Sequence, residues 1–247
     1  MIRTTAGPVA VIRMEHGKVQ AMDLELVEAL EDALRDAADA PAIVLTGSGR
    51  AFSAGVDLKR LLDGGDAYVD RFLPALSEVM VRLFAHPGPV VAAINGHAIA
   101  GGCVLACACD YKVMAETGAT IGIPELEVGV PFPVAPLEIL RFALADPHLQ
   151  ELVYLGRTYG ADVARSRGMV DEIVPADQVT SRALAVAERL ASGPAARFRL
   201  TKQQLRRPAL DRIALDGPRA DPAVVAAWKD PATLAAIRTY LDGLRSR

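Results

Sequence analysis

The amino-acid sequence predicts an α/β fold, and three observations support this class. Short apolar segments with strand character alternate with amphipathic helical segments through most of the chain, a pattern typical of sheets covered by helices. Strand character disappears after Pro175, and the remaining segments are helical in pattern. The length of 247 residues is enough for one large domain with its own core. We therefore expect an α/β core over residues 1–190 and a helical region over residues 191–247.

The N-terminal part of the chain predicts a strand, a helix and a second strand. Residues 9–17 have the composition of a strand followed by a turn. Asp23 is a suitable N-cap for an amphipathic helix that runs to about Ala38. Residues 42–46 are apolar throughout until the final threonine, which predicts a strand buried on both faces.

The next segment predicts a loop followed by an interrupted helix. Residues 47–57 contain three glycines and are expected to form the loop. A helix begins at residues 58–62, is broken at Gly64–Gly65, and continues as an amphipathic segment through residues 73–83.

Residues 89–109 are nearly free of charge and long enough to span a bilayer. A polar turn beginning at Asn95 and the Gly101–Gly102 pair interrupt this stretch. A buried strand over residues 90–94, a tight turn and a buried helix over residues 103–109 explain every residue. We favour that interpretation over a membrane span.

The rest of the chain predicts two strands and three helices. Residues 110–115 predict a third strand, and residues 120–130 a fourth, interrupted by Pro124. The expected helices are separated by Gly193–Pro194 and by residues 216–218. They cover residues 177–191, 195–206 and 222–245.

Composition excludes several classes of function. Twenty-seven basic residues against 30 acidic ones give a net charge of −3, so no basic surface is expected for nucleic acid. Aromatic residues make up 5% of the chain, which leaves few platforms for stacking bases. We expect neither a nucleic acid nor a membrane as a partner.

The three cysteines indicate a reducing compartment. Cys103, Cys107 and Cys109 lie within one short apolar run, and an odd number so placed is not a disulfide framework. Their spacing does not match a zinc site, so we expect buried thiols and no metal. Glycine, proline and arginine interrupt any secretion-signal pattern at the N-terminus. A cytoplasmic enzyme is the expectation.

Two familiar catalytic patterns are incomplete. Residues 47–52 follow a strand but lack the third glycine of the dinucleotide-binding fingerprint. Residues 51–55 resemble a nucleophile elbow, but Ala51 stands where the first glycine is required. We therefore expect Ser53 to be structural and not a nucleophile.

Two glycine-bearing bends remain as candidate functional loops. The first covers residues 53–57, directly after a buried strand, and the second covers residues 100–103, where the chain enters an apolar helix. First-turn N–H groups of a helix have no intrahelical acceptor and lie at the positive end of its dipole. Such groups bind anions or a developing oxyanion. Tight helix–strand packing is the alternative explanation for the small residues.

Four ordered segments resemble the enoyl-CoA hydratase/isomerase (crotonase) superfamily, over roughly residues 8–190. The segments are AFSAGVDL (51–58), PVVAAINGHAIAGGCVLACACDY (89–111), IGIPELEVG (121–129) and YGADVARSRGMVDEIVP (159–175). The resemblance implies a spiral of β-β-α units that form two roughly perpendicular sheets. It also implies a C-terminal helical trimerisation region, and hence a homotrimer or a dimer of trimers.

The resemblance implies an acyl-CoA thioester substrate, with no cofactor besides the coenzyme A of the substrate itself. By motif position, the N–H groups of Val56 and Gly101 would form an oxyanion hole for the thioester carbonyl. The residues expected to line the substrate site are Lys18, Val19, Ala54, Gly55, Asp57, Leu58, Val104 and Phe132.

A departure from the family pattern points to one reaction. Hydratases of the family use two carboxylates, and this chain has Val104 at the first position and Glu125 at the second. One carboxylate is enough for a 1,3-proton shift, so the resemblance implies a Δ3,Δ2-enoyl-CoA isomerase with Glu125 as its catalytic base. The family's dienoyl-CoA isomerases carry an Asp where this chain has Pro133. A divergent hydratase and a non-catalytic acyl-CoA-binding homologue remain as alternatives.

Several residues keep two interpretations. Glu127 is the rival of Glu125 as base, and His97 is expected to be a hydrogen-bonded turn residue more than a substrate contact. On the C-terminal helices, Trp228, Lys229 and Arg238 are either a solvated face or a coenzyme A contact. Acyl-chain length would depend on four apolar side chains, Leu61, Leu62, Phe72 and Phe132.

Overall fold

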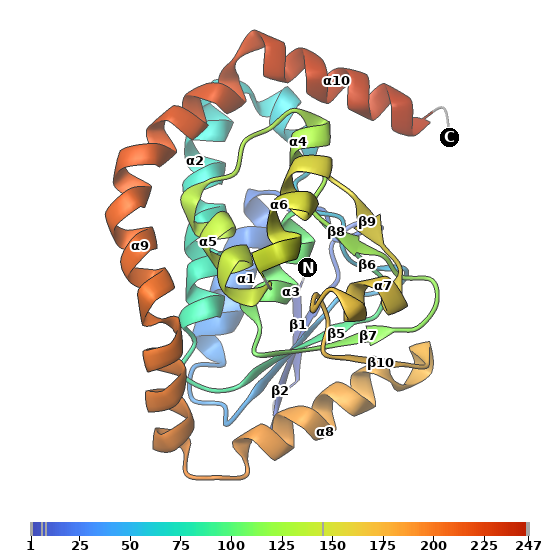
Figure 1. Ribbon diagram of the computed structural model, residues 1–247, viewed down its shortest axis with the longest axis vertical. Coiled ribbons are helices and arrows are strands. Elements are labelled where there is room, and N and C mark those ends of the chain that lie inside the picture. Colours follow the sequence, from blue (N-terminus) through green and yellow to red (C-terminus); the bar gives the residue numbers. More distant parts are fainter. Residues whose placement is uncertain (1, 6, 8, 145, 246–247) are drawn as a thin grey trace.

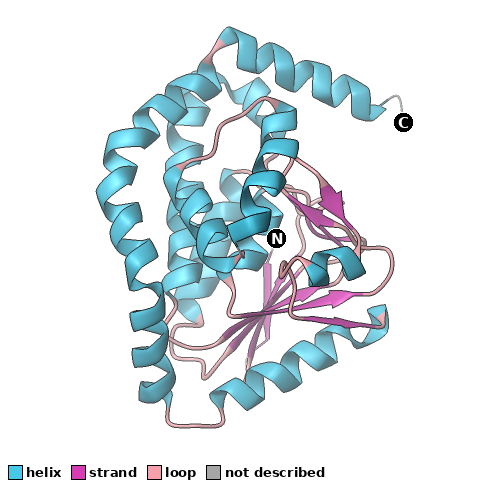
Figure 2. Cartoon of the chain, in the orientation of Figure 1, coloured by secondary structure: helices cyan, strands magenta, loops and turns pink. Residues whose placement is uncertain are grey.

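Two β-sheets and a set of covering helices make up the protein (Figures 1 and 2). The computed structural model describes residues 2–5, 7, 9–144 and 146–245. The α/β class predicted from the alternation of strands and helices is confirmed.

The larger sheet has six strands in the order β1-β2-β3-β5-β7-β10. The β1–β2 pair is antiparallel, and each later neighbour is parallel. Strands β3 and β5 are buried at every residue, as expected for parallel strands with both faces covered. The strands are β1 (Ile2–Thr5), β2 (Ala10–Met14), β3 (Ile43–Thr46), β5 (Val90–Ile94), β7 (Tyr111–Ala115) and β10 (Glu172–Val174).

The smaller sheet holds four short strands in the order β4-β6-β8-β9. Two of them were predicted as loop or turn, because a strand of three residues is too short to show a periodic pattern. The strands are β4 (Ala51–Ser53), β6 (His97–Ile99), β8 (Ile121–Gly122) and β9 (Thr158–Tyr159).

The first two helices confirm the predictions made from their caps and breaks. Helix α1 (Leu24–Asp36) begins where the Asp23 side chain accepts a hydrogen bond from the Leu26 N–H. Helix α2 (Leu58–Ala85) begins after Asp57 and is kinked at Gly65, whose φ of 63° and ψ of −163° are not helical.

Helix α3 (Gly101–Ala108) is buried at all eight residues, between α2 and α5 (Val134–Ala143). Within the described residues, no helix is both long and apolar enough to cross a bilayer. The charge-free run at residues 89–109 is instead divided among β5, β6 and α3.

The strand predicted over residues 120–130 is wrong after Pro124. Helix α4 (Glu125–Val128) forms there, and Gly129 ends it in the left-handed region at φ 94°. The N–H groups of Gly129 and Val130 both donate to the Glu125 carbonyl at 3.0 and 2.9 Å, which is the capping geometry of a helix C-terminus. The helix therefore separates Glu125 from Glu127, where a strand would place them on one face.

Helix α6 (Asp146–Leu155) precedes β9 in the sequence, and helix α7 (Ala161–Ser166) lies between β9 and β10. A short 3₁₀ turn (Ala176–Gln178) leads into α8 (Val179–Ala191), which packs against β3, β5 and β7 at the foot of Figure 1.

The C-terminal region is helical, as predicted, but the break expected at residues 216–218 is wrong. Helix α9 (Ala195–Lys229) continues through three prolines and bends along the length of the molecule (Figure 1). Contacts to the core hold this stretch, since the Asp221 carboxylate accepts from the Val134 N–H at 2.8 Å. Helix α10 (Pro231–Arg245) then crosses the end of the fold beside α4.

Candidate active site

A small, mostly apolar cavity of about 70 Å³ lies where the two glycine-bearing bends meet α2, α3 and α9. Side chains from the loop before α2, from α2, from both sides of α4 and from the two C-terminal helices line it. Glu125 is the only carboxylate among these lining residues. The lining residues are Ala54, Val56, Leu58, Leu73, Leu76, Met80, Ile99, Ala100, Gly101, Val104, Pro124, Glu125, Val128, Val130, Pro131, Phe132, Pro133, Pro136, Trp228 and Tyr240.

The two bends contact each other through residues with positive φ. Gly55 has φ 82° and Ala100 has φ 53°, and a side chain on Gly55 would come within 2.6 Å of the Ala100 Cβ and 3.1 Å of the Gly101 nitrogen. Only glycine fits the first position. At Ala100 a non-glycine residue in this region stores backbone strain, which is common at functional sites.

Gly55 and Ala100 are followed by Val56 and Gly101, whose backbone N–H groups make no hydrogen bond to the backbone of the described residues. Around the first bend, the Met22 N–H donates to the Gly55 carbonyl at 2.7 Å, and the Asp57 N–H donates to the Met22 carbonyl at 2.9 Å. The N–H of Val56, between these two residues, takes part in neither bond. Gly101 opens α3, where first-turn N–H groups have no intrahelical partner. The two groups therefore lie beside one cavity as unused donors, an arrangement that can hold an anionic oxygen.

Glu125 carries the one carboxyl among the described residues that line this cavity. Its side chain is buried, and Oε2 is without a hydrogen-bond partner among the described residues. Removal from water raises the pKa of Glu125 to about 8, because the apolar surroundings disfavour the charged carboxylate. A carboxyl with a pKa in this range can both accept and return a proton near neutral pH.

Val104 faces the same cavity from α3 and is buried. It stands where the resemblance implied the first carboxylate of a hydratase. The described part of α3 therefore presents no ionisable carboxyl to the cavity.

The structure brings most of the predicted site residues together. Glu125, Val56 and Gly101 meet at the cavity, as do four of the predicted substrate-lining residues, namely Ala54, Leu58, Val104 and Phe132. Gly55 is buried at the contact between the two bends.

Three predicted residues lie outside the cavity. Asp57 caps α2 by accepting from the Arg60 N–H at 2.9 Å. Lys18 and Val19 are exposed, and the Val19 carbonyl accepts from the Ala54 N–H at 3.0 Å. These positions border the bend that carries Val56 without lining the apolar space.

The structure also shows where the residues with two interpretations lie. Glu127 is exposed on α4. His97 lies in β6, with Nδ1 2.9 Å from the Thr120 hydroxyl. Ser53 is buried and donates its hydroxyl proton to the Gln20 carbonyl at 2.8 Å, a structural role.

For the C-terminal helices, the sequence left open a solvated face or a coenzyme A contact, and neither interpretation describes Trp228. Trp228 is buried against the cavity, and its Nε1 donates to the Pro131 carbonyl at 2.9 Å. Lys229 pairs with Asp70 at 2.7 Å, and Arg238 is exposed.

Of the four residues expected to control chain length, only Phe132 lines the cavity. Leu73, Leu76 and Met80 lie on one face of α2, and this spacing could have indicated that α2 lines the cavity. The same spacing equally predicts ordinary core packing.

The three cysteines are buried thiols, as expected. Burial raises the pKa of Cys109 to about 12. Over the described part of the chain, no three His, Cys, Asp or Glu side chains are grouped as metal ligands.

A two-sheet α/β fold with helical C-terminal segments, closed around a cavity between two glycine-bearing bends, is the crotonase fold. The chain belongs to the enoyl-CoA hydratase/isomerase family, whose model matches residues 4–217.

Individual relatives carry different activities in their names. A putative enoyl-CoA hydratase of Thermus thermophilus is 35% identical over 213 residues, covering 83% of each chain. The mitochondrial enoyl-CoA delta isomerase 1 of Mus musculus is 31% identical over 216 residues, covering 85% of this chain and 75% of the relative. The crystal structure of human mitochondrial delta3-delta2-enoyl-CoA isomerase superposes with a TM-score of 0.94 at 25% identity, covering 99% of this chain and 98% of that one. The superfamily and its fold, predicted from four sequence segments, are thereby confirmed.

Proposed function

We propose that this protein converts 3-enoyl-CoA thioesters into 2-trans-enoyl-CoA by a 1,3-proton shift. The observation that carries the proposal is the single carboxyl of the cavity: Glu125 is buried, has a free oxygen and a pKa raised to about 8, and faces an apolar Val104. One base that is alternately free and protonated is sufficient for this reaction.

The proposed reaction moves one proton between two carbons. The Glu125 carboxylate takes a proton from C2, and the electrons of that C–H bond spread over the diene and the thioester oxygen. As the double bond settles between C2 and C3, protonated Glu125 returns the proton to C4. Nothing is added or lost, so substrate and product are isomers.

The proposed oxyanion hole consists of the N–H groups of Val56 and Gly101. Their support is geometric, because both follow positive-φ residues and both lie beside the cavity of Glu125. A fixed donor of this kind contributes about 3–4 kcal/mol to transition-state stability. In this proposal, Lys18, Val19 and Asp57 border the entrance on the coenzyme A side, and the coenzyme is part of the substrate. We further propose a homotrimer or a dimer of trimers in solution.

The experiment that tests the proposal is product identification by NMR after incubation with 3-hexenoyl-CoA. The proposal expects 2-trans-hexenoyl-CoA to accumulate with no hydrated product. Absence of any isomerisation, with the protein folded and binding the thioester, would contradict the proposal and leave the hydratase and the non-catalytic acyl-CoA-binding alternatives.

Enoyl-CoA hydration is the second candidate, favoured by the names of relatives such as that of Thermus thermophilus. Hydration needs a second group to activate water, and the valine at position 104 cannot transfer protons. A 2-enoyl-CoA substrate separates the two candidates, since a hydratase gives the 3-hydroxyacyl thioester and the proposed isomerase does not. In Val104→Glu, hydration is expected to rise above the wild-type level.

A further inference from the structure

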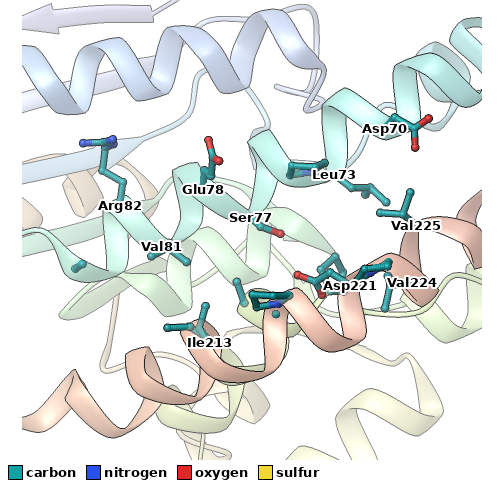
Figure 3. A pocket seen from close by; sticks show the side chains of 18 of the residues that line it. Asp70, Leu73, Ser77, Glu78, Val81, Arg82, Ile213, Asp221, Val224 and Val225 are labelled. Carbon is teal, nitrogen blue, oxygen red and sulfur yellow. The ribbon is translucent and has the colours of Figure 1, made fainter.

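A second, much larger hollow lies beside the candidate active site, between α2 and α9 (Figure 3). Its volume is about 1270 Å³. Leu73 and Val81 from α2 face Ile213, Val224 and Val225 from α9 across it (Figure 3). We refer to this hollow as the α2–α9 groove.

Most of the charged side chains at the groove are engaged by neighbouring groups, and Glu78 on α2 is the exception among those described. Lys229 pairs with Asp70 at 2.7 Å. Asp221 accepts from the Val134 N–H at 2.8 Å, and Arg82 pairs with Glu31. Because these paired charges are already satisfied and the facing side chains of α2 and α9 are apolar, the space between the two helices favours an apolar occupant.

The groove and the catalytic cavity share a wall. Leu73 and Pro133 line both spaces. Leu73 is 2% exposed, so its side chain is closely packed where the two spaces adjoin. Leu76, one turn along the same helix, lines the catalytic cavity alone.

The two spaces differ in what they can hold. The cavity of about 70 Å³ has the volume of about two liquid waters, at roughly 30 Å³ each. It has room for the carbons nearest the thioester but not for a long tail. A longer tail would have to pass Leu73 to reach the groove.

We propose that Leu73 sets the upper limit of acyl-chain length, and that the α2–α9 groove receives a longer acyl tail once this side chain is shortened. The inference rests on the proposed function in that it concerns the acyl group of the same thioester substrate. It assigns to Leu73 a specificity-determining role and predicts a wild-type preference for short chains.

The test compares Leu73→Ala with the matched control Leu76→Ala. The measured quantity is the ratio of kcat/KM for 3-dodecenoyl-CoA to that for 3-hexenoyl-CoA. Each methylene newly buried in an apolar site improves transition-state binding about fourfold, so the ratio is expected to rise at least tenfold in Leu73→Ala. In Leu76→Ala the ratio is expected to stay within about threefold of wild type. An unchanged ratio in Leu73→Ala, or an equal rise in both variants, would overturn the proposal.

A binding measurement makes the test independent of turnover. Trp228 is the one tryptophan in the sequence and lines the catalytic cavity, so its fluorescence reports on acyl groups that enter. Titration with the saturated hexanoyl-CoA and dodecanoyl-CoA is expected to show tighter dodecanoyl-CoA binding only after Leu73 is shortened. If wild type binds both thioesters but never isomerises an enoyl-CoA, the proposed function fails while the length limit is still measured. Should Leu73→Ala fail to fold by circular dichroism, Leu73→Val provides the same comparison with a smaller expected rise, and no rise in that variant would count against the proposal.

Discussion

Two carboxyl groups of this molecule differ in how many hydrogen-bond partners surround them. Glu125 faces the apolar cavity with one oxygen unpartnered among the described residues. Asp110, where α3 gives way to β7, accepts hydrogen bonds from the Val90 N–H and Lys202 at 2.7 Å each and forms an ion pair with Arg206 at 2.8 Å.

The Asp110 cluster joins the C-terminal helix to the core. Arg206, on α9, also donates to the carbonyls of Phe84, Ala108 and Cys109. Two of these carbonyls belong to the C-terminal end of α3, where the helix dipole favours a cation. Lys202 donates in addition to the Gly88 carbonyl at 3.0 Å.

The difference between the two carboxyls separates structure from chemistry. A charge with every partner in place holds its surroundings together. A buried carboxyl without partners is costly to ionise, which raises its pKa into the range useful for proton transfer. Four predictions test this contrast.

The largest effect is expected from Glu125→Gln. The amide keeps the shape of the side chain but cannot accept a proton from carbon, so kcat is expected to fall by about 10²–10⁴-fold. Steady-state kinetics with 3-hexenoyl-CoA give the measurement, and circular dichroism serves as the control for folding. Retention of wild-type kcat would remove Glu125 from the mechanism.

Asp110→Ala is expected to act on stability. It leaves Lys202 and Arg206 buried without their acid, which costs about 3–5 kcal/mol. Urea unfolding measures this loss. Asp63→Ala is the matched control, because it removes an exposed ion pair with Lys59 that is worth less than about 1 kcal/mol. Equal losses in both variants would show that the buried cluster does not hold α9 to the core.

The raised pKa of Glu125 is expected to make the free energy of unfolding depend on pH. In the unfolded chain the carboxyl ionises near its ordinary pKa of 4.5, whereas the folded protein retains the proton to about pH 8. Between these values the native state binds the extra proton, so wild-type stability falls as pH rises, by about 1.4 kcal/mol per pH unit. Relative to wild type, Glu125→Gln is therefore expected to gain about 3–4 kcal/mol in unfolding free energy between pH 5 and pH 8. Urea unfolding at the two pH values is the measurement, and a pH-independent difference would contradict the raised pKa.

The smallest effect is expected from Glu127→Gln. This carboxyl is exposed on α4, and its loss is expected to change kcat/KM less than twofold. A large fall in kcat/KM would mean that Glu127, and not Glu125, acts on the substrate.

The sequence was sufficient to predict the strands and helices that have strong local signals. Asp23 marked the start of α1, and Gly64–Gly65 marked the kink of α2. The two glycine-bearing bends and Glu125 were found because short motifs specify them locally.

The features that sequence missed depend on contacts distant along the chain. Helix α9 passes through prolines that locally predict a stop, since bonds such as that of Trp228 to Pro131 hold it to the core. Helix α4 replaces the expected strand because Gly129 closes a single turn. The shared wall at Leu73 exists only once α9 lies across α2, so its apolar spacing alone predicted nothing beyond core packing.

The pH profile of kcat/KM for wild-type enzyme with 3-hexenoyl-CoA tests most directly whether one buried carboxyl performs the reaction. This parameter reports the ionisations of the free enzyme. We expect the rate to rise with pH through a single ionisation near pH 8, the pKa of Glu125 in its apolar cavity. A rate that does not change between pH 6.5 and 9.5, or a bell-shaped profile that requires a second group, would contradict the single-base account.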